Sequence, residues 1–179
     1  KAKSCYEKVI KIDPNYVKAH NNLGVIFEKL REYQKAKSCY EKVIKIDPNY
    51  VNAHYNLGII YQELGEIEKA KECFEKTIEI DPNFVNAHYN LGNILKELGE
   101  LEKAKECYEK AIEIDPNYID AHNNLGVAFK ELKENQKAKE CFEKTIEIDP
   151  NYADAHKNLG NLLKQKRLLS KIEQAKKSE

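Results

Sequence analysis

Apolar residues form two stripes at helical spacing within residues 51–84 of this chain. The first stripe stops at Gly65, which breaks a helix, and the second stops at Asp81-Pro82, because a residue before proline is pushed out of the α region. The pattern predicts a helix, a tight turn, a second helix and a proline-containing turn, with Asn83 close to the N-cap position of the next helix. The stripes consist of Ala53, Leu57, Ile60, Tyr61 and Leu64, and of Ile67, Ala70, Phe74, Thr77, Ile78 and Ile80.

The same pattern recurs every 34 residues, and it includes residue types that often carry chemistry. A fixed period of this length is typical of proteins built from stacked structural repeats. We therefore interpret the periodic residues first as packing and turn positions. They are Pro14, Pro48, Pro82, Pro116 and Pro150; His20, His54, His88, His122 and His156; and Cys5, Cys39, Cys73, Cys107 and Cys141.

A glycine lies inside the first helix of each repeat, where it costs about 1 kcal/mol relative to alanine. Close approach of two helices explains such a glycine. In residues 51–84 we expect the small Ala70 of the second helix to face Gly58, and Phe74 to fill the remaining space.

The repeat closely resembles the tetratricopeptide repeat (TPR) family. The residues that carry the resemblance are Leu57-Gly58, Tyr61, Gly65, Ala70, Phe74 and Pro82, and His54 stands where the family usually has tryptophan. The resemblance implies an all-α fold, a right-handed superhelix (solenoid) of antiparallel helix pairs. It also implies that the first helices line a concave face and that the domain binds other proteins. Full repeats are expected at residues 17–50, 51–84, 85–118 and 119–152, and repeats two and three differ at only seven positions.

The two ends of the chain depart from the full repeat. Residues 1–16 match a second helix and its turn, so Tyr6, Val9 and Ile10 should be partly uncovered, open to upstream repeats or to another chain. Residues 153–179 match a further first helix followed by a degenerate capping helix, which a capping box at residues 170–173 would start. Leu168, Leu169 and Ile172 would then cover the end of the stack. A start within a repeat, and the lack of any methionine, lead us to expect a piece of a longer protein.

The amino-acid composition argues against several classes of function. The 30 basic and 30 acidic residues balance, so nothing provides the positive field that nucleic acid or an anionic membrane requires. No apolar stretch is long enough to span a membrane. Five cysteines a repeat apart cannot pair, because stacked helices lie about 8–10 Å apart, so we expect free thiols and a cytoplasmic or nuclear location.

No arrangement of residues indicates catalysis. Periodic histidines lie too far apart to share a metal, whose ligands lie about 2 Å from the ion, and no nucleophile–base pair or phosphate-binding glycine loop occurs. The sequence predicts no enzyme, no cofactor and no metal site.

One asparagine per repeat falls on the first helix, on the expected concave face. Asparagine is a mediocre helix former with no evident packing role there, and its amide can both donate to and accept from an extended peptide. This row is similar to the asparagines of the repeat domain of the O-linked N-acetylglucosamine transferase, which implies binding of a partner's backbone. Residues beside the asparagines differ from repeat to repeat, and they would select the partner's side chains. We expect Tyr55 and Tyr89, beside Ile59, to form a side-chain pocket, with Asn93 on the same edge of the groove as Ile59. The row is Asn22, Asn56, Asn90, Asn124 and Asn158.

The leading hypothesis is a protein–protein interaction scaffold that binds an extended segment of an unidentified partner protein or peptide. Two other classes stay open. One is a structural, self-assembling array that associates through the open N-terminal face. The other is a substrate-targeting domain of a larger enzyme, such as a glycosyltransferase.

Overall fold

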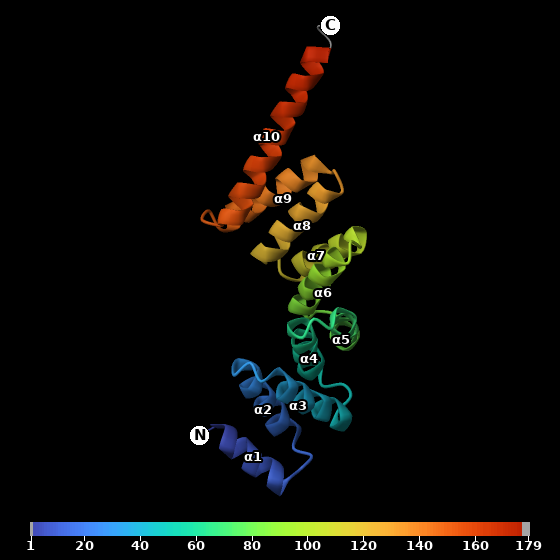
Figure 1. Cartoon of the computed structure of the whole chain (residues 1–179), viewed down its shortest axis with the longest axis vertical. Helices are drawn as coiled ribbons and strands as arrows, with labels where there is room; N and C mark the ends of the chain where they lie inside the picture. The colour runs from blue at the N-terminus through green and yellow to red at the C-terminus, as the bar shows by residue number, and fades with distance from the viewer. Residues whose placement is uncertain (1, 177–179) are drawn as a thin grey trace. The chain divides into compact units, whose positions relative to one another are not determined.

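The structure is a computed structural model that describes the backbone of residues 2–176, with side chains except at 169, 171–173, 175 and 176. This part of the chain is all-helical and contains no strand (Figure 1). The helices are α1 (Ala2–Ile12), α2 (Val17–Lys29), α3 (Tyr33–Ile46), α4 (Val51–Glu63), α5 (Ile67–Ile80), α6 (Val85–Glu97), α7 (Leu101–Ile114), α8 (Ile119–Glu131), α9 (Asn135–Ile148) and α10 (Ala153–Lys176).

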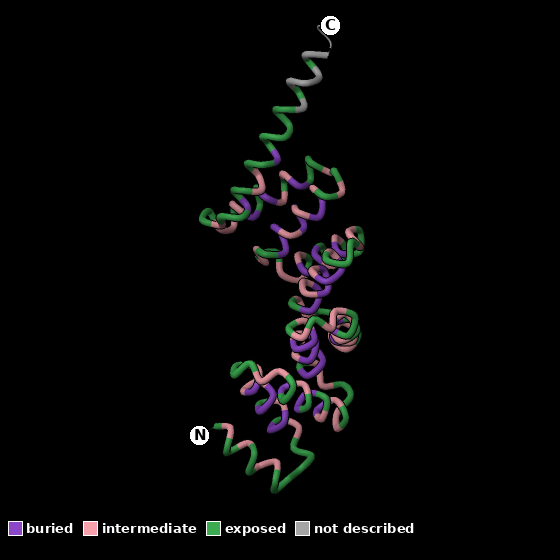
Figure 2. Tube along the Cα trace, viewed as in Figure 1, coloured by how far each residue is buried: buried purple, intermediate pink, exposed green. Residues whose placement is uncertain are grey.

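The chain forms two compact units, residues 1–87 (unit 1) and 88–179 (unit 2). In unit 1, α2 packs on α3, α3 on α4, and α4 on α5; in unit 2, α7 packs on α8, α8 on α9, and α9 on α10. Buried positions recur along these helices (Figure 2). The predicted all-α fold of stacked helix pairs is confirmed.

In α2, α4, α6 and α8 the glycine inside the first helix lies against a large aromatic ring of the second helix. A Cβ atom added to Gly58 would lie 2.7 Å from Cε1 of Phe74, whose side chain is fully buried. The same distance is 2.6 Å from Gly24 to Tyr40, from Gly92 to Tyr108 and from Gly126 to Phe142. The expected pairing of small with large is therefore present, but the nearest atoms to the glycine belong to the aromatic residue rather than to the alanine.

Two side chains fix each proline-containing turn. The backbone N–H of Asn83 donates to Oδ1 of Asp81 at 3.0 Å, which closes the turn locally. The equivalent helices α2, α4 and α8 have a tyrosine at the N-cap position and no side-chain cap, so asparagine does not cap them. The Nε2–H of His54 donates to the carbonyl oxygen of Pro48 at 2.8 Å. Equivalent bonds join His20 to Pro14, His122 to Pro116 and His156 to Pro150, each at 2.9 Å. The histidine thus ties a first helix to the turn before it.

Helix α10 corrects the expectation for the end of the chain. It runs without interruption from Ala153 to Lys176, so Ser170 lies inside a helix and does not start a separate capping helix. No glycine or proline follows Gly160 to stop it. Leu168 is 60% exposed and does not cover the stack, whereas the side chains of Leu169 and Ile172 lie outside the described residues.

Helix α1 packs on α2 but has no buried residue. Tyr6, Val9 and Ile10 are half-buried, as expected for a second helix described without its first.

Candidate functional site

The asparagine row lies on the first helices, as the sequence indicated. Asn22 on α2 is exposed and Asn56 on α4 is half-buried in unit 1. Asn90 on α6, Asn124 on α8 and Asn158 on α10 are half-buried in unit 2. The asparagines are therefore partly accessible to solvent in each unit.

In unit 2 the asparagine amides take part in hydrogen bonds between first helices. Nδ2 of Asn124 donates to Oδ1 of Asn93 at 2.9 Å and to the hydroxyl of Tyr89 at 3.2 Å. Nδ2 of Asn158 donates to Oδ1 of Asn123 at 3.2 Å. Each bond joins a helix to the equivalent helix of the preceding repeat.

In unit 1 the partner of Asn22 is a tyrosine hydroxyl of a second helix. Nδ2 of Asn22 donates to the hydroxyl of Tyr6 at 3.3 Å. The hydroxyl of Tyr40 donates to Oε2 of Glu28, on the first helix of the same repeat, at 2.9 Å. Burial, and then the nearby Glu28 carboxylate, raise the pKa of Tyr40 and keep it a donor. The expectation that these asparagines have no packing role is therefore wrong for Asn22, Asn124 and Asn158, which link successive repeats.

The tyrosines chosen for a side-chain pocket pack between aromatic rings. The Tyr55 ring lies 4.8 Å from that of Phe84 and 5.8 Å from that of Phe74, measured between centroids. Tyr89 lies 5.1 Å from Tyr118 and 6.1 Å from Tyr108. Both tyrosines are half-buried, so they are packing residues with one exposed edge.

Ile59 and Asn93 occupy different surroundings. Ile59 is half-buried and lines a shallow pocket between α2 and α4. The other lining residues are Glu28, Lys29, Arg31, Tyr33 and Glu63. Oδ1 of Asn93 accepts from the Tyr108 hydroxyl at 2.8 Å as well as from Asn124.

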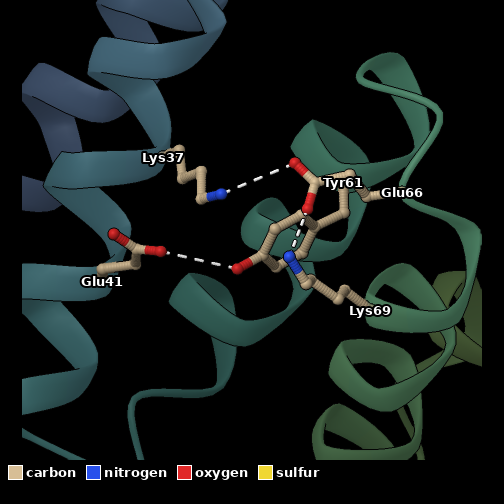
Figure 3. A network of polar contacts seen from close by, with 5 residues as sticks. All are labelled: Lys37, Glu41, Tyr61, Glu66 and Lys69. Atoms are coloured by element: carbon tan, nitrogen blue, oxygen red, sulfur yellow. Dashed lines mark hydrogen bonds and ion pairs between the residues drawn. The ribbon is translucent and has the colours of Figure 1, made fainter.

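A polar network that the sequence reasoning missed joins α3, α4 and α5 (Figure 3). Nζ of Lys37 and Nζ of Lys69 lie 4.8 and 5.5 Å from the centroid of the Tyr61 ring. Both ammonium groups pair with Glu66, at 3.5 and 2.5 Å. Two other first-helix aromatic rings also have two lysine ammonium groups over them. These are the Phe27 ring, with Lys3 and Lys35, and the Phe129 ring, with Lys105 and Lys137. The signal was present in the sequence as two lysines that keep the 34-residue period beside this aromatic position.

Replacing Tyr61 by leucine should lower the free energy of unfolding by about 1–2 kcal/mol, because both cation–π contacts are lost. Leucine already stands at the equivalent positions 95 and 163, so the residue is compatible with the fold. Tyr61→Phe is the matched control and should cost less than about 0.5 kcal/mol, since the hydroxyl makes only a 3.5 Å contact with Glu41. Urea denaturation measures both. Equal losses in the two variants would assign the stability to the hydroxyl instead of the ring.

The cysteines are free thiols in the structure. Burial raises the pKa of Cys39 to about 11 and, with nearby glutamates, the pKa of Cys73 and of Cys141 to about 12. Such thiols stay protonated near neutral pH and are poor nucleophiles. Within residues 2–176, no three His, Cys, Asp or Glu side chains are placed to hold a metal ion, and none of the helices is long and apolar enough to cross a membrane.

Comparison with protein families decides the classification. The model described as "Tetratricopeptide repeat" matches residues 17–50, 51–84 and 119–152. The chain belongs to the tetratricopeptide repeat family. A second TPR model matches residues 73–106 and 141–177, and a third residues 1–30 and 92–133. The fold is typical of protein–protein interaction scaffolds, whose stacked repeats provide extended binding surfaces, and members of this kind are generally not catalytic.

Solved structures of TPR proteins are similar over most of the chain. A crystal structure of MamA is 29% identical, with a TM-score of 0.79 over 84% of this chain and 88% of that one. MamA 41-end from Desulfovibrio magneticus RS-1 is 25% identical, with a TM-score of 0.76 over 84% of this chain and 85% of that one. Pseudomonas aeruginosa pilF is 26% identical, with a TM-score of 0.75 over 84% of this chain and 69% of that one. No curated protein sequence matches significantly.

Proposed function

We propose that this TPR chain is an interaction scaffold that binds an extended segment of a partner protein across its first helices. The proposal rests on one observation: every first helix carries an asparagine at the same place, and each of these asparagines is partly accessible to solvent. Amide groups suit the backbone of an extended peptide. Tyr55 and Tyr89 would offer their exposed edges to the partner's side chains, next to Ile59 and Asn93.

The hydrogen bonds that link the repeats support the proposal because they hold the amides in place before a partner arrives. A pre-organised side chain loses little conformational entropy on binding. Each new hydrogen bond contributes a net of about 0.5–1.5 kcal/mol. A few of them, minus the ordering of the peptide, give an affinity in the micromolar range at best.

The variant Asn56→Ala/Asn90→Ala/Asn124→Ala tests the proposal. We expect it to reduce recovery of partner proteins at least about tenfold in a quantitative pull-down, since several backbone contacts are lost at once. The matched control is Glu75→Ala/Glu109→Ala/Glu143→Ala, which changes one exposed residue per repeat on the second helices. Because Asn124 also links repeats, circular dichroism must show that both variants are folded. Unchanged recovery by the folded asparagine variant would refute groove binding.

Self-association is a second candidate, favoured by the half-buried apolar side chains of α1. Light scattering on the 179-residue chain tests it. A strict monomer at high concentration would eliminate this candidate.

Binding on behalf of a linked enzyme, such as a glycosyltransferase, is a third candidate, which rests on the asparagine row alone. Free thiols favour a reducing compartment such as the cytoplasm or nucleus as the place of action.

A further inference from the structure

We infer that the first-helix face of unit 2 binds a basic segment, which it recognises through hydrogen-bond donors. This inference deepens the proposed function and rests on it. We define the unit 2 face by Asn93, Asp120, Asn124, Asp154 and Asn158. Asn93 lies on α6, the next two on α8 and the last two on α10.

On this face Asn124 and Asn158 point their amide nitrogen atoms at neighbouring helices, whereas Asn93 accepts through Oδ1 from Tyr108 and Asn124. Asn124 uses both of its N–H groups, on Asn93 and Tyr89, and Asn158 donates to Asn123. Oδ1 of Asn124 receives only a long contact of 3.4 Å from Nδ2 of Asn123. An amide oxygen has two lone pairs. Asn124 can therefore accept further hydrogen bonds but has no donor left for a partner's carbonyl group.

Carboxylates lie next to these amide oxygens. Asp120 precedes Asn124 by four residues and Asp154 precedes Asn158 by four, so each pair occupies one face of its helix. Both aspartates are exposed. The hydroxyl of Tyr152 donates to Oδ1 of Asp120 at 2.6 Å, which orients this carboxylate and leaves Oδ2 able to accept.

We call the row of first-helix surface positions that contains these aspartates and asparagines the polar stripe, and its other charged residues are also negative. Glu97 on α6 and Glu131 on α8 continue it and are exposed. No Lys or Arg occurs at the polar-stripe positions of unit 2. These positions are 90, 93 and 97 on α6, 120, 124, 127 and 131 on α8, and 154, 158, 161 and 165 on α10. Lys157 lies beside the stripe on α10. In unit 1 the corresponding stripe of α2 begins with Lys18 and ends with Lys29, whereas that of α4 has no Lys or Arg and ends with Glu63.

The acceptor oxygen of Asn124 and the carboxylates of Asp120 and Asp154 complement a segment that presents donors and positive charge. Arginine fits best, because a guanidinium group offers five N–H donors and no acceptor. Backbone N–H groups of the same segment would reach the oxygen of Asn124. Complementary charge of this kind sets the choice of partner more than the total affinity, and between exposed groups it weakens as salt is added.

The experiment compares short peptides of equal length with alternating Arg-Ser, Gln-Ser and Glu-Ser, titrated into the whole chain by fluorescence anisotropy. We expect the Arg-Ser peptide to bind about tenfold more tightly than Gln-Ser at low salt, and Glu-Ser to bind least, as two or three exposed charge pairs allow. Asp120→Asn/Asp154→Asn should bring the Arg-Ser advantage down to about twofold or less. Asparagine keeps an acceptor for Tyr152, so the fold is retained.

Two control variants separate this face from the general charge of the chain. Glu106→Gln/Glu109→Gln removes two exposed charges from α7, a second helix, and should preserve the Arg-Ser advantage. Lys157→Gln should increase it. An advantage that is unchanged in the aspartate variant, or equally reduced by the α7 variant, overturns the inference.

The asparagine variant distinguishes this failure from failure of the proposed function. If all three peptides bind alike and Asn56→Ala/Asn90→Ala/Asn124→Ala abolishes binding, the scaffold proposal stands and the basic partner is wrong. If no peptide binds, the inference is overturned and the scaffold proposal loses support as well.

Discussion

Replacing Gly58 by alanine is expected to lower the free energy of unfolding by about 2 kcal/mol or more. The added Cβ would lie 2.7 Å from Cε1 of Phe74 and 3.0 Å from two further ring atoms. Phe74 is fully buried, so its ring can move only by displacing neighbouring side chains or separating α4 from α5. Overpacking of a filled core costs about 1–3 kcal/mol. Leucine at the same position would force the helices apart. Urea denaturation followed by circular dichroism measures both changes.

Gly160→Ala is the matched control, because the chain contains the same glycine without its aromatic partner. A Cβ at Gly160 meets no atom within 4 Å. Alanine inside α10 should therefore raise helix stability by up to about 1 kcal/mol. If Gly58→Ala and Gly160→Ala change stability equally, the ring contact does not explain why glycine occurs at this position.

Glycine at Arg31 and Lys133 should stabilise the chain, by about 1 kcal/mol at each site. These residues lie in the turns directly after α2 and α8, with φ angles of 57° and 65° in the left-handed region. Side chains with a Cβ pay about 1–2 kcal/mol there, whereas glycine does not. At the equivalent turns of the other two repeats the chain has Gly65 and Gly99, with φ angles of 72° and 77°. The melting temperature of Arg31→Gly/Lys133→Gly should rise by several degrees.

Replacing Arg167 by glycine should instead lower the stability of the chain. Arg167 occupies the equivalent position of the period but lies inside the continuous helix α10. Glycine there costs about 1 kcal/mol of helix stability. A loss of α10 helicity on circular dichroism would confirm the contrast; stabilisation by Arg167→Gly would refute the view that backbone conformation decides these effects.

The fold followed from the sequence because its signals are local and repeated. Gly65 stops one helix, the residue before Pro82 stops the next, and Phe74 recurs with the period as a buried ring. Because the same pattern recurs in every repeat, a helix boundary that is ambiguous in one repeat is defined by the others. The contact between Gly58 and the Phe74 ring needed coordinates, since two residues of the second helix were plausible neighbours of the glycine.

The candidate site was only partly predictable. The position of Asn124 on a first helix followed from the period, but its hydrogen bonds reach Tyr89 and Asn93, which belong to the preceding repeat. Such bonds depend on how repeats stack and not on the spacing within one repeat. The orientation of the amide, which decides what a partner must offer, was therefore invisible in the sequence.

The end of the chain shows the limit of local signals. Ser170 has the sequence of a helix start, but a start forms only where the preceding helix stops. Arg31 and Lys133 turn the chain because a second helix follows and packs on the first. After Arg167 the residues lack the alanine and aromatic of a second helix, so α10 continues instead of turning.

The packing of each helix on its neighbours in the chain also bears on how such a protein changes over evolutionary time. Removing or duplicating one block of 34 residues would bring together helix surfaces that already meet elsewhere in the array. Gene duplication can therefore lengthen the protein without first evolving a new interface. Residues 51–84 and 85–118, which differ at seven positions, have the close similarity that such a copying event leaves. The substitutions that accumulate afterwards on the first-helix surface are free to give each copy its own partner preference.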